Sequence, residues 1–270
     1  MPNVNGYEST LLKDDADERD MLLSMTASNN SEPTLPTYVD HSPNLSPIKD
    51  QGYLGSCVGF AVTALKEWQE QKEHKEEVKA GKYDHRKDKK YYDLSEQWLY
   101  YKCKEIDPWP GVDGTSIRYA MKVLKNSGIP VEEGWAYNDL TPGKPKEWAK
   151  WVAKWNTIES YHRVISLNDL KTSLVTSPIP IGVGIFQEFQ YVSRSGIIQY
   201  PRTTSKSLGG HAILACGFDD RRQLIKFKNS WTTNWGQHGY GYLTYSYINN
   251  FMWDAWAAKD HSVTTEMYRN

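Results

Sequence analysis

The chain is 270 residues long and carries 32 basic and 33 acidic residues, which gives a formal net charge of −1 at pH 7. This length is sufficient to bury a large core in one domain or in two lobes. The near-balance of charge gives no indication of binding to nucleic acid or to an anionic membrane, and no run of about 20 apolar residues is present to span a bilayer.

The cysteine content and the N-terminus bear on where the protein works. Three cysteines are too few for the disulfide framework of a secreted domain. The first residues, Met-Pro-Asn-Val-Asn-Gly-Tyr-Glu, contain no apolar stretch of the kind found in signal peptides. These features favour a cytoplasmic, reducing location, although a sequence trimmed from a secreted protein would look the same.

Residues 1–38 are expected to form a polar, acidic N-terminal segment that is distinct from the rest of the chain, residues 39–270. Ser28-Asn-Asn-Ser-Glu-Pro33 has the composition of a linker. The linker would separate the segment from the main folding unit.

Residues 57 to about 145 are expected to form a helical lobe. A small and apolar run follows Cys57, which predicts a helix from that residue to about Glu77. Asp93 stands three residues before Glu96, the spacing of a capping box at the start of a second helix. A third helix is expected over 117–126. The charged stretch up to residue 90 mixes both signs and indicates a solvated helix end followed by an exposed loop.

The aromatic residues are numerous enough to suggest a sugar-binding or nucleic-acid-binding surface, with 11 Trp and 18 Tyr. Packing is the favoured interpretation. Trp148, Trp151 and Trp155 recur at intervals of three and four, which predicts one face of a helix packed on a core.

From about residue 157 the pattern changes to short apolar or alternating runs bounded by Gly, Pro and Asp, which predicts strands. These runs cover 179–185, 211–218, 224–229 and 240–245. They are expected to form a β-rich lobe within residues 146–260. The predicted fold class is therefore α+β.

Four residues, Gln51, Cys57, His211 and Asn229, supply the groups that nucleophilic acyl transfer requires. A thiol becomes a strong nucleophile when a nearby imidazole takes its proton, and an Asn amide can orient that imidazole without adding charge. A Gln side chain and the backbone N–H of the nucleophile can donate to a developing oxyanion. The predicted helix start at Cys57 also favours the thiolate, because the positive end of the helix dipole lies there.

These residues lie within four sequence blocks that resemble the papain-like cysteine peptidases, over residues 39 to about 245. The blocks are Gln51-Gly-Tyr-Leu-Gly-Ser-Cys57-Val-Gly-Phe-Ala, Leu94-Ser-Glu-Gln97, His211-Ala-Ile-Leu-Ala-Cys-Gly217 and Lys228-Asn-Ser-Trp231-Thr-Thr-Asn-Trp235-Gly-Gln-His-Gly239. All four occur in order with compatible spacing. The chain is similar to disulfide-poor, microbial-type members of the family.

The resemblance implies a papain-like two-lobe fold, with a helical lobe, an antiparallel β-barrel-like lobe and the active site in the cleft between them. Cys57 would be the nucleophile, His211 the general base and acid, Asn229 its orienting partner and Gln51 the oxyanion donor. The family's shielding indoles fall on Trp231, which would cover the His–Asn hydrogen bond, and Trp235.

Two positions depart from the family pattern. Leu54 stands where a cysteine is usual, which removes a disulfide, and Val58 replaces the aromatic residue that usually follows the nucleophile. The second change alters the packing beside the thiolate, so rate or specificity could differ. Neither change removes a catalytic group.

Substrate-binding positions are also implied by the resemblance. Gly114 would pair with the substrate main chain, and the strand over 181–185 would help to line the pocket that sets side-chain preference. The substrate-binding set is Gly55, Gly114, Thr115, Ser116, Gly210 and Ala212. No histidine, cysteine or carboxylate pattern has metal-ligand spacing, and no metal or cofactor is expected.

The activity expected from the resemblance is that of a cysteine endopeptidase, which cleaves polypeptides through a thioacyl-enzyme. One alternative keeps the site but transfers the acyl group to an amine, as a peptide ligase or transpeptidase does. Another is a papain-like pseudo-peptidase that serves as a binding module. The stretch Asp15-Ala-Asp-Glu-Arg-Asp20 resembles a short signature ahead of microbial catalytic domains. Residues 1–38 would either cover the cleft as a short propeptide or pack along the surface.

Overall fold

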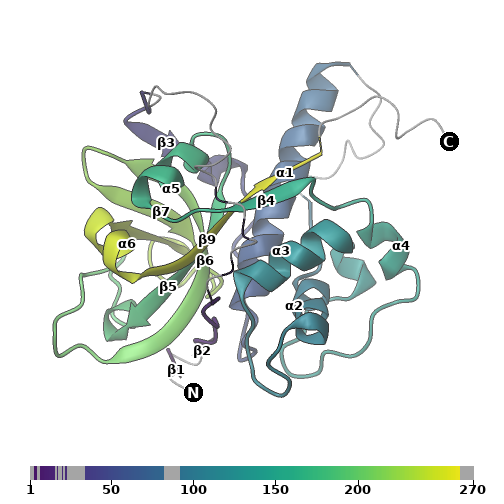
Figure 1. Cartoon of the computed structure of the whole chain (residues 1–270), viewed down its shortest axis with the longest axis horizontal. Coiled ribbons are helices and arrows are strands. Elements are labelled where there is room, and N and C mark those ends of the chain that lie inside the picture. Colours follow the sequence, from purple (N-terminus) through teal and green to yellow (C-terminus); the bar gives the residue numbers. More distant parts are fainter. Residues whose placement is uncertain are drawn as a thin grey trace.

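The computed structural model describes residues 3–4, 7–15, 17, 20, 22, 34–81 and 92–261. The predicted linker over 28–33 and the charged loop beyond residue 81 lie outside the described residues. Within them, the chain forms a helical lobe and a β-rich lobe side by side, as Figure 1 shows.

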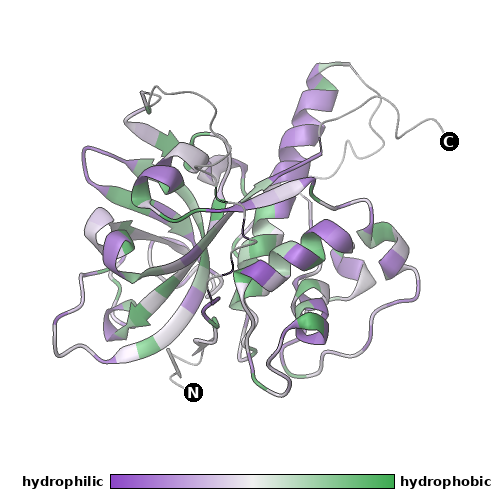
Figure 2. Cartoon of the chain, viewed as in Figure 1, coloured by the Kyte–Doolittle hydropathy of each residue, from purple (hydrophilic) through white to green (hydrophobic). Residues whose placement is uncertain are grey.

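The helical lobe contains α1 (Cys57–Lys79), α2 (Glu96–Ile106), α3 (Ile117–Asn126) and α4 (Ala149–Ala153). The first and third helices confirm the sequence-based expectations, including the start of α1 at Cys57. Every residue of α1 from Cys57 to Gln71 is buried, and beyond that point the helix is largely solvated. Figure 2 shows the same division, with hydrophobic residues in one half of α1 and polar residues in the protruding half.

The second lobe is built on an antiparallel sheet. Its strands follow the order β4-β9-β5-β6-β7-β8, and β3 pairs with the C-terminal end of β6. The strands are β3 (Tyr38–Asp40), β4 (Ser160–Arg163), β5 (Ile179–Phe186), β6 (Ser207–Asp219), β7 (Leu224–Lys228), β8 (Tyr240–Thr244) and β9 (Met252–Lys259). The four predicted strands are confirmed, and the α+β two-lobe fold class with them.

Shorter elements complete the described chain. They are β1 (Asn3–Val4), β2 (Tyr7–Glu8), α5 (Leu167–Leu174), α6 (Tyr245–Phe251) and the 3-10 turns η2 (Ser42–Asn44), η3 (Glu132–Gly134) and η4 (Gln187–Phe189). Two large hydrophobic clusters result: one lies inside the β lobe, and the other joins α1, α2 and α3 to the side of the sheet that faces them.

Two sequence-based expectations about helices are corrected. The side chain of Ser95, not that of Asp93, caps α2, because its hydroxyl accepts a hydrogen bond of 3.0 Å from the backbone N–H of Trp98. The predicted tryptophan face is wrong as well. The side chains of Trp148, Trp151 and Trp155 are 39%, 61% and 79% exposed.

The reason lies in the length of α4, which has only five residues. Its buried face consists of Ala149 and Ala153, which pack against Trp98 of α2. Small residues let the helix approach α2 closely, and the large indoles remain outside. α4 therefore packs with the helices, although the sequence-based boundary near residue 146 assigned it to the β lobe.

A buried polar network joins the two lobes behind the cleft. Lys49 Nζ lies 2.9 Å from Glu67 of α1 and 2.6 Å from Glu96 of α2. Lys228 of β7 donates to Ser46, at 2.8 Å, and the Ser46 hydroxyl donates to Glu67. Burial lowers the pKa of Lys228 to about 8. The network fixes residues 46–49, which lead directly into Gln51.

All three cysteines of the chain are free and buried. Within the described ranges, the search for a helix with the length and apolar character of a membrane span finds none.

Candidate active site

His211, Asn229 and Trp231 come together because β6 and β7 pair in antiparallel register, with Leu214 opposite Lys228. His211 Nε2 and Asn229 Oδ1 are 2.8 Å apart. The indole of Trp231 stacks on the imidazole, with 4.4 Å between ring centroids and an interplanar angle of 26°. Trp235 packs edge-on against Trp231 at 5.6 Å. The imidazole is thus oriented by an amide and shielded by an indole.

Hydrogen bonds from the residues after Asn229 hold the side chain of Gln51. Its Oε1 accepts hydrogen bonds from Ser230 Oγ at 2.7 Å and from Trp231 Nε1 at 3.2 Å. Its Nε2 donates to the backbone oxygen of Leu54 at 3.2 Å. The hydroxyl of Tyr137 donates to the backbone oxygen of Gln51 at 2.6 Å. These contacts aim the amide group toward the loop that ends at Cys57.

Cys57 is the first residue of α1 and is completely buried, as is His211. Burial raises the pKa of the Cys57 thiol, and backbone hydrogen bonds from Ala212 and Thr10 oppose that rise. Burial also lowers the pKa of His211 to about 4, although the Asn229 side chain opposes this shift. In this state both groups are therefore uncharged near neutral pH.

The burial comes from the N-terminal segment, which lies between the lobes (Figure 1). Leu11 N–H donates to the backbone oxygen of Gly210 at 2.9 Å, and Leu12 N–H donates to that of Thr115 at 3.0 Å. Tyr7 stacks on Trp231 with 5.3 Å between ring centroids. Residues 7–12 thus touch both lobes and cover the thiol and the imidazole.

Each residue of the predicted substrate-binding set lies along the path of this segment. A Cβ added to Gly55 or Gly114 would overlap Thr10, and Gly114 has a φ of +89°, so only glycine suits both the conformation and the close approach. Ala212 shares a hydrophobic cluster with Leu11. The structure thus brings together Gly55, Gly114, Thr115, Ser116, Gly210 and Ala212 around residues 9–14.

Farther along, the segment is held by charge. Asp14 accepts hydrogen bonds from the Ser116 hydroxyl and, at 3.3 Å, from the backbone N–H of Arg118. Asp20 Oδ2 lies 2.6 Å from Arg118 Nη2 and 3.0 Å from Arg163 Nη1. Sequence reasoning missed these contacts. The acidic run over residues 14–20 was the visible signal, but nothing in the sequence pointed to its basic partners.

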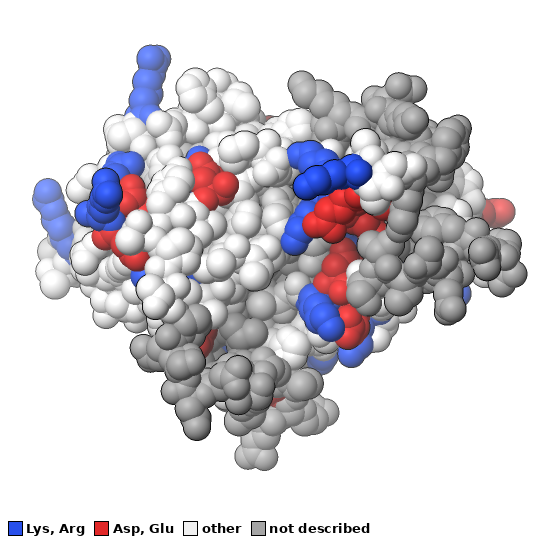
Figure 3. Space-filling view, turned by 90° about the horizontal axis from the view of Figure 1, so that it is seen from above, with Lys and Arg blue, Asp and Glu red and all other residues white. Residues whose placement is uncertain are grey.

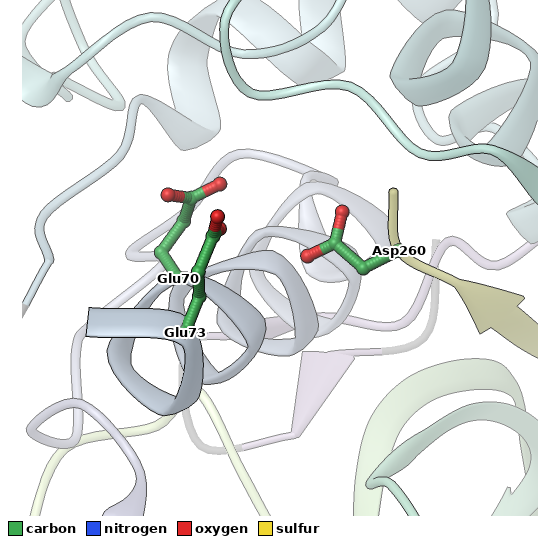
Figure 4. A group of neighbouring side chains, drawn as sticks. All are labelled: Glu70, Glu73 and Asp260. Carbon is green, nitrogen blue, oxygen red and sulfur yellow. The ribbon is translucent and has the colours of Figure 1, made fainter. Parts of the chain in front are cut away.

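Away from the cleft, three carboxylates of the described residues, Glu70, Glu73 and Asp260, are close enough together to hold a metal ion. Figure 4 shows Glu70 and Glu73 on α1 and Asp260 beyond the end of β9. The buried ammonium of Lys66 lies 2.9 Å from Glu70 and 2.7 Å from Asp260. Lys66 therefore supplies the positive charge that this group needs. Burial and Glu70 raise the pKa of Glu73 to about 7.

A groove of about 710 Å³ lies beside these carboxylates, between α1, the end of α5 and β9. Its lining includes Lys72, Glu73, Glu76, Lys259 and Asp260. Figure 3 shows acidic and basic side chains next to one another on this side of the molecule. The mixed signs give the groove no preference for a ligand of one charge. Trp68, the lining residue of α1 nearest to Cys57 in the sequence, lies 11 residues after it (68 − 57), which corresponds to roughly 17 Å along the helix.

Comparisons with known proteins bear on the family and the fold of the chain. A family model described as papain family cysteine protease matches residues 35–254. The crystal structure of xylellain, a cysteine protease from Xylella fastidiosa, is 28% identical, with a TM-score of 0.78, and the match covers 95% of this chain and 97% of that one.

Among curated relatives, a cathepsin L-like peptidase of Aedes aegypti is 31% identical over 76% of this chain and 58% of its own length. An uncharacterized peptidase C1-like protein of Acanthamoeba polyphaga mimivirus is 28% identical over 78% of this chain and 69% of its own length. The chain thus spans little more than half of the mosquito protein.

Proposed function

The chain belongs to the papain family of cysteine proteases, and from that premise we propose that it hydrolyses peptide bonds within polypeptides through a thioacyl-enzyme. The observation that carries the proposal is the 2.8 Å contact between His211 and Asn229 under the indole of Trp231, together with the buried thiol of Cys57, which meets the backbone N–H of Ala212, the residue after His211.

Each residue then has a stated role. His211 Nδ1 has no hydrogen-bond partner among the described residues, so it is the nitrogen available to take the Cys57 proton. The thiolate attacks the substrate carbonyl carbon, and the oxyanion receives hydrogen bonds from the Gln51 amide and the Cys57 N–H. His211 gives the proton to the departing amine. Water, activated by His211, then cleaves the thioester and restores the thiol.

The N-terminal segment keeps this machinery inactive in the intact chain. It excludes water from the site, and dehydration disfavours the thiolate and the imidazolium together. It also occupies the positions that a substrate would need. Removal of residues 7–15 from the cleft would rehydrate both groups and bring their pKa values toward the range in which the ion pair forms.

The test uses the full chain with residues 28–33 replaced by the recognition sequence of a specific protease. The folded protein is cut there, and the released segment is removed by gel filtration. An epoxide peptide is added to the cut and uncut forms, and adducts are mapped by mass spectrometry. We expect one adduct, on Cys57, far faster in the cut form and absent from a His211→Ala variant. Cys103→Ala is the matched control and should label normally.

Two outcomes would overturn parts of the proposal. A folded, cut protein without an adduct would favour the pseudo-peptidase, whereas equal labelling of both forms would exclude gating by the segment. The ligase alternative is separated by products. In the presence of an added amino-acid amide, a peptidase releases free acid, while a ligase forms mainly the new amide bond.

A further inference from the structure

Two guanidinium groups converge at the end of the cleft beyond Leu11. Arg118 comes from the first turn of α3 and Arg163 from the last residue of β4. Their side chains are only 8% and 16% exposed. Both lie over the indole of Trp256, at 5.6 Å and 5.9 Å from the ring centroid. Buried guanidinium groups are held in proteins by paired acids, because an unpaired buried charge is costly.

The pairing acids come almost entirely from the N-terminal segment. The Asp14 carboxylate accepts hydrogen bonds from the Ser116 hydroxyl and the Arg118 backbone N–H. Its Oδ1 lies 3.7 Å from Arg118 Nη1. Asp20 bridges Arg118 and Arg163. When the segment leaves the cleft, both carboxylates leave with it.

The body of the protein offers one carboxylate of its own here. Asp254 is 3% exposed, its carboxyl group lies beside Asp14 and the indole of Trp256, and Arg163 Nε lies 3.9 Å away. The pKa of Asp254 is raised well above its usual range. Burial is the main cause, and the neighbouring Asp14 is the second. Even when Asp254 ionises in the open cleft, two guanidinium groups face one carboxylate. The open cleft therefore keeps an excess of positive charge.

We infer that Ser116, Arg118 and Arg163 form a subsite for an acidic side chain of a peptide substrate, which Asp14 and Asp20 occupy in the closed chain. The inference rests on the proposed function, because it requires the segment to leave and a peptide to enter. Asp14 stands three residues from Leu11, which is hydrogen-bonded to Gly210 beside His211. An acid within about four residues of the cleaved bond would therefore reach the subsite.

The experiment uses the cut, gel-filtered protein and internally quenched peptides. Asp, Asn or Lys is placed in turn at each position within four residues of the cleaved bond. At one position we expect kcat/KM to be about tenfold or more higher for Asp than for Asn, since a charge-assisted pair replaces a neutral one. Arg118→Gln should abolish this difference, and Arg118→Lys should restore part of it. Arg221→Gln, at an exposed turn, is the matched control.

All rates are normalised to the fraction of protein that an epoxide peptide labels, so that misfolded variants do not count. Equal kcat/KM for Asp and Asn at every position would overturn the subsite while leaving the peptidase intact. A preference for Lys that disappears in Asp254→Asn would also overturn it and place a cation subsite at Asp254. If no peptide is cleaved and Cys57 is not labelled, the proposed function itself fails.

Discussion

The two ends of the covered cleft are closed by different physical means. At the chemical end, Cys57 and His211 are completely buried, and the partner of the imidazole is the neutral amide of Asn229. At the other end, Arg118 and Arg163 meet carboxylates from the N-terminal segment. Under the proposed gating, the difference indicates a division of labour, in which charge anchors the segment and exclusion of water inactivates the nucleophile. Each end can be changed separately.

The largest effect is expected from breaking the chemical end. Cys57→Ala should lower kcat/KM of the cut enzyme by about 10³-fold or more, since no other group can form the thioester. Hydrolysis of a quenched peptide measures this. Cys103→Ala removes an equally buried thiol from α2 and should leave the rate unchanged; a comparable loss there would mean that packing, not chemistry, was affected.

Breaking the charged end should open the cleft without touching the chemistry. Asp20→Asn removes the carboxylate that bridges Arg118 and Arg163, and we expect Cys57 in the uncut chain to label about 10- to 100-fold faster. Asp15→Asn is the matched control, because that side chain is exposed and only its backbone oxygen contacts Arg118. The gating role of the charged pairs is refuted if both variants label at the rate of the unmodified chain.

The pH dependence of labelling should report on the protonation of the buried His211. In the closed chain the pKa of His211 is lowered from 6.5 to about 4 by burial. Between these values His211 of an open site binds a proton that His211 of the closed site does not, so this group favours opening in acid by at most tenfold per pH unit, whereas Asp254, whose pKa is raised in the closed chain, acts in the opposite direction. The effect is absent above pH 6.5 and complete near pH 4.

The measurement is the labelling rate of the uncut chain divided by that of the cut enzyme, which cancels the intrinsic pH dependence of the thiol. In an Asp254→Asn background, which removes the opposing carboxylate, the ratio should rise as the pH falls below 6.5. Asp20→Asn should keep the same slope. A slope that vanishes in this variant would assign the pH response to the carboxylate instead of the imidazole.

The smallest effect concerns the apolar pocket between the two ends. A Cβ at Gly182 would overlap the tip of the Leu11 side chain. Gly182→Ala should therefore speed labelling of the uncut chain about threefold to tenfold, a modest overpacking effect. Adding Leu11→Ala should create the space that the new methyl group needs. If the uncut double variant is labelled faster than the product of the two single effects predicts, direct contact between the new methyl group and Leu11 is not the cause of opening.

The sequence was sufficient to predict the chemical end because each of its residues lies in a local pattern. The small, apolar run after Cys57 predicts α1, and the runs around His211 and Asn229 predict the strands that deliver them. The roles assigned to Cys57, His211, Asn229 and Gln51 remain predictions until the labelling experiment is made. Their positions, including the contacts of Gln51 with Ser230 and Trp231, are those that such roles require.

The charged end could not be predicted, because its pairs join residues 98 to 143 positions apart, and one sequence does not reveal which acid meets which base. Strand β9 was missed for a local reason. The chain passes from α6 at Phe251 to β9 at Met252 without the glycine or proline that marks strand boundaries. The prediction for the tryptophans around α4 was wrong because periodicity predicts which residues share a helical face. It does not predict which of those side chains a five-residue helix can bury.

The covalent attachment of the segment that carries Tyr7, Leu11 and Asp14 has a consequence for control. A tethered ligand meets its site at a millimolar effective concentration, whatever the concentration of the protein. The proposed inhibition in the intact chain would therefore be insensitive to dilution. One cut in the connection turns it into an ordinary bimolecular equilibrium, and at low protein concentration the freed segment would leave and not return. Activation would then need a single break and no destruction of the inhibitor.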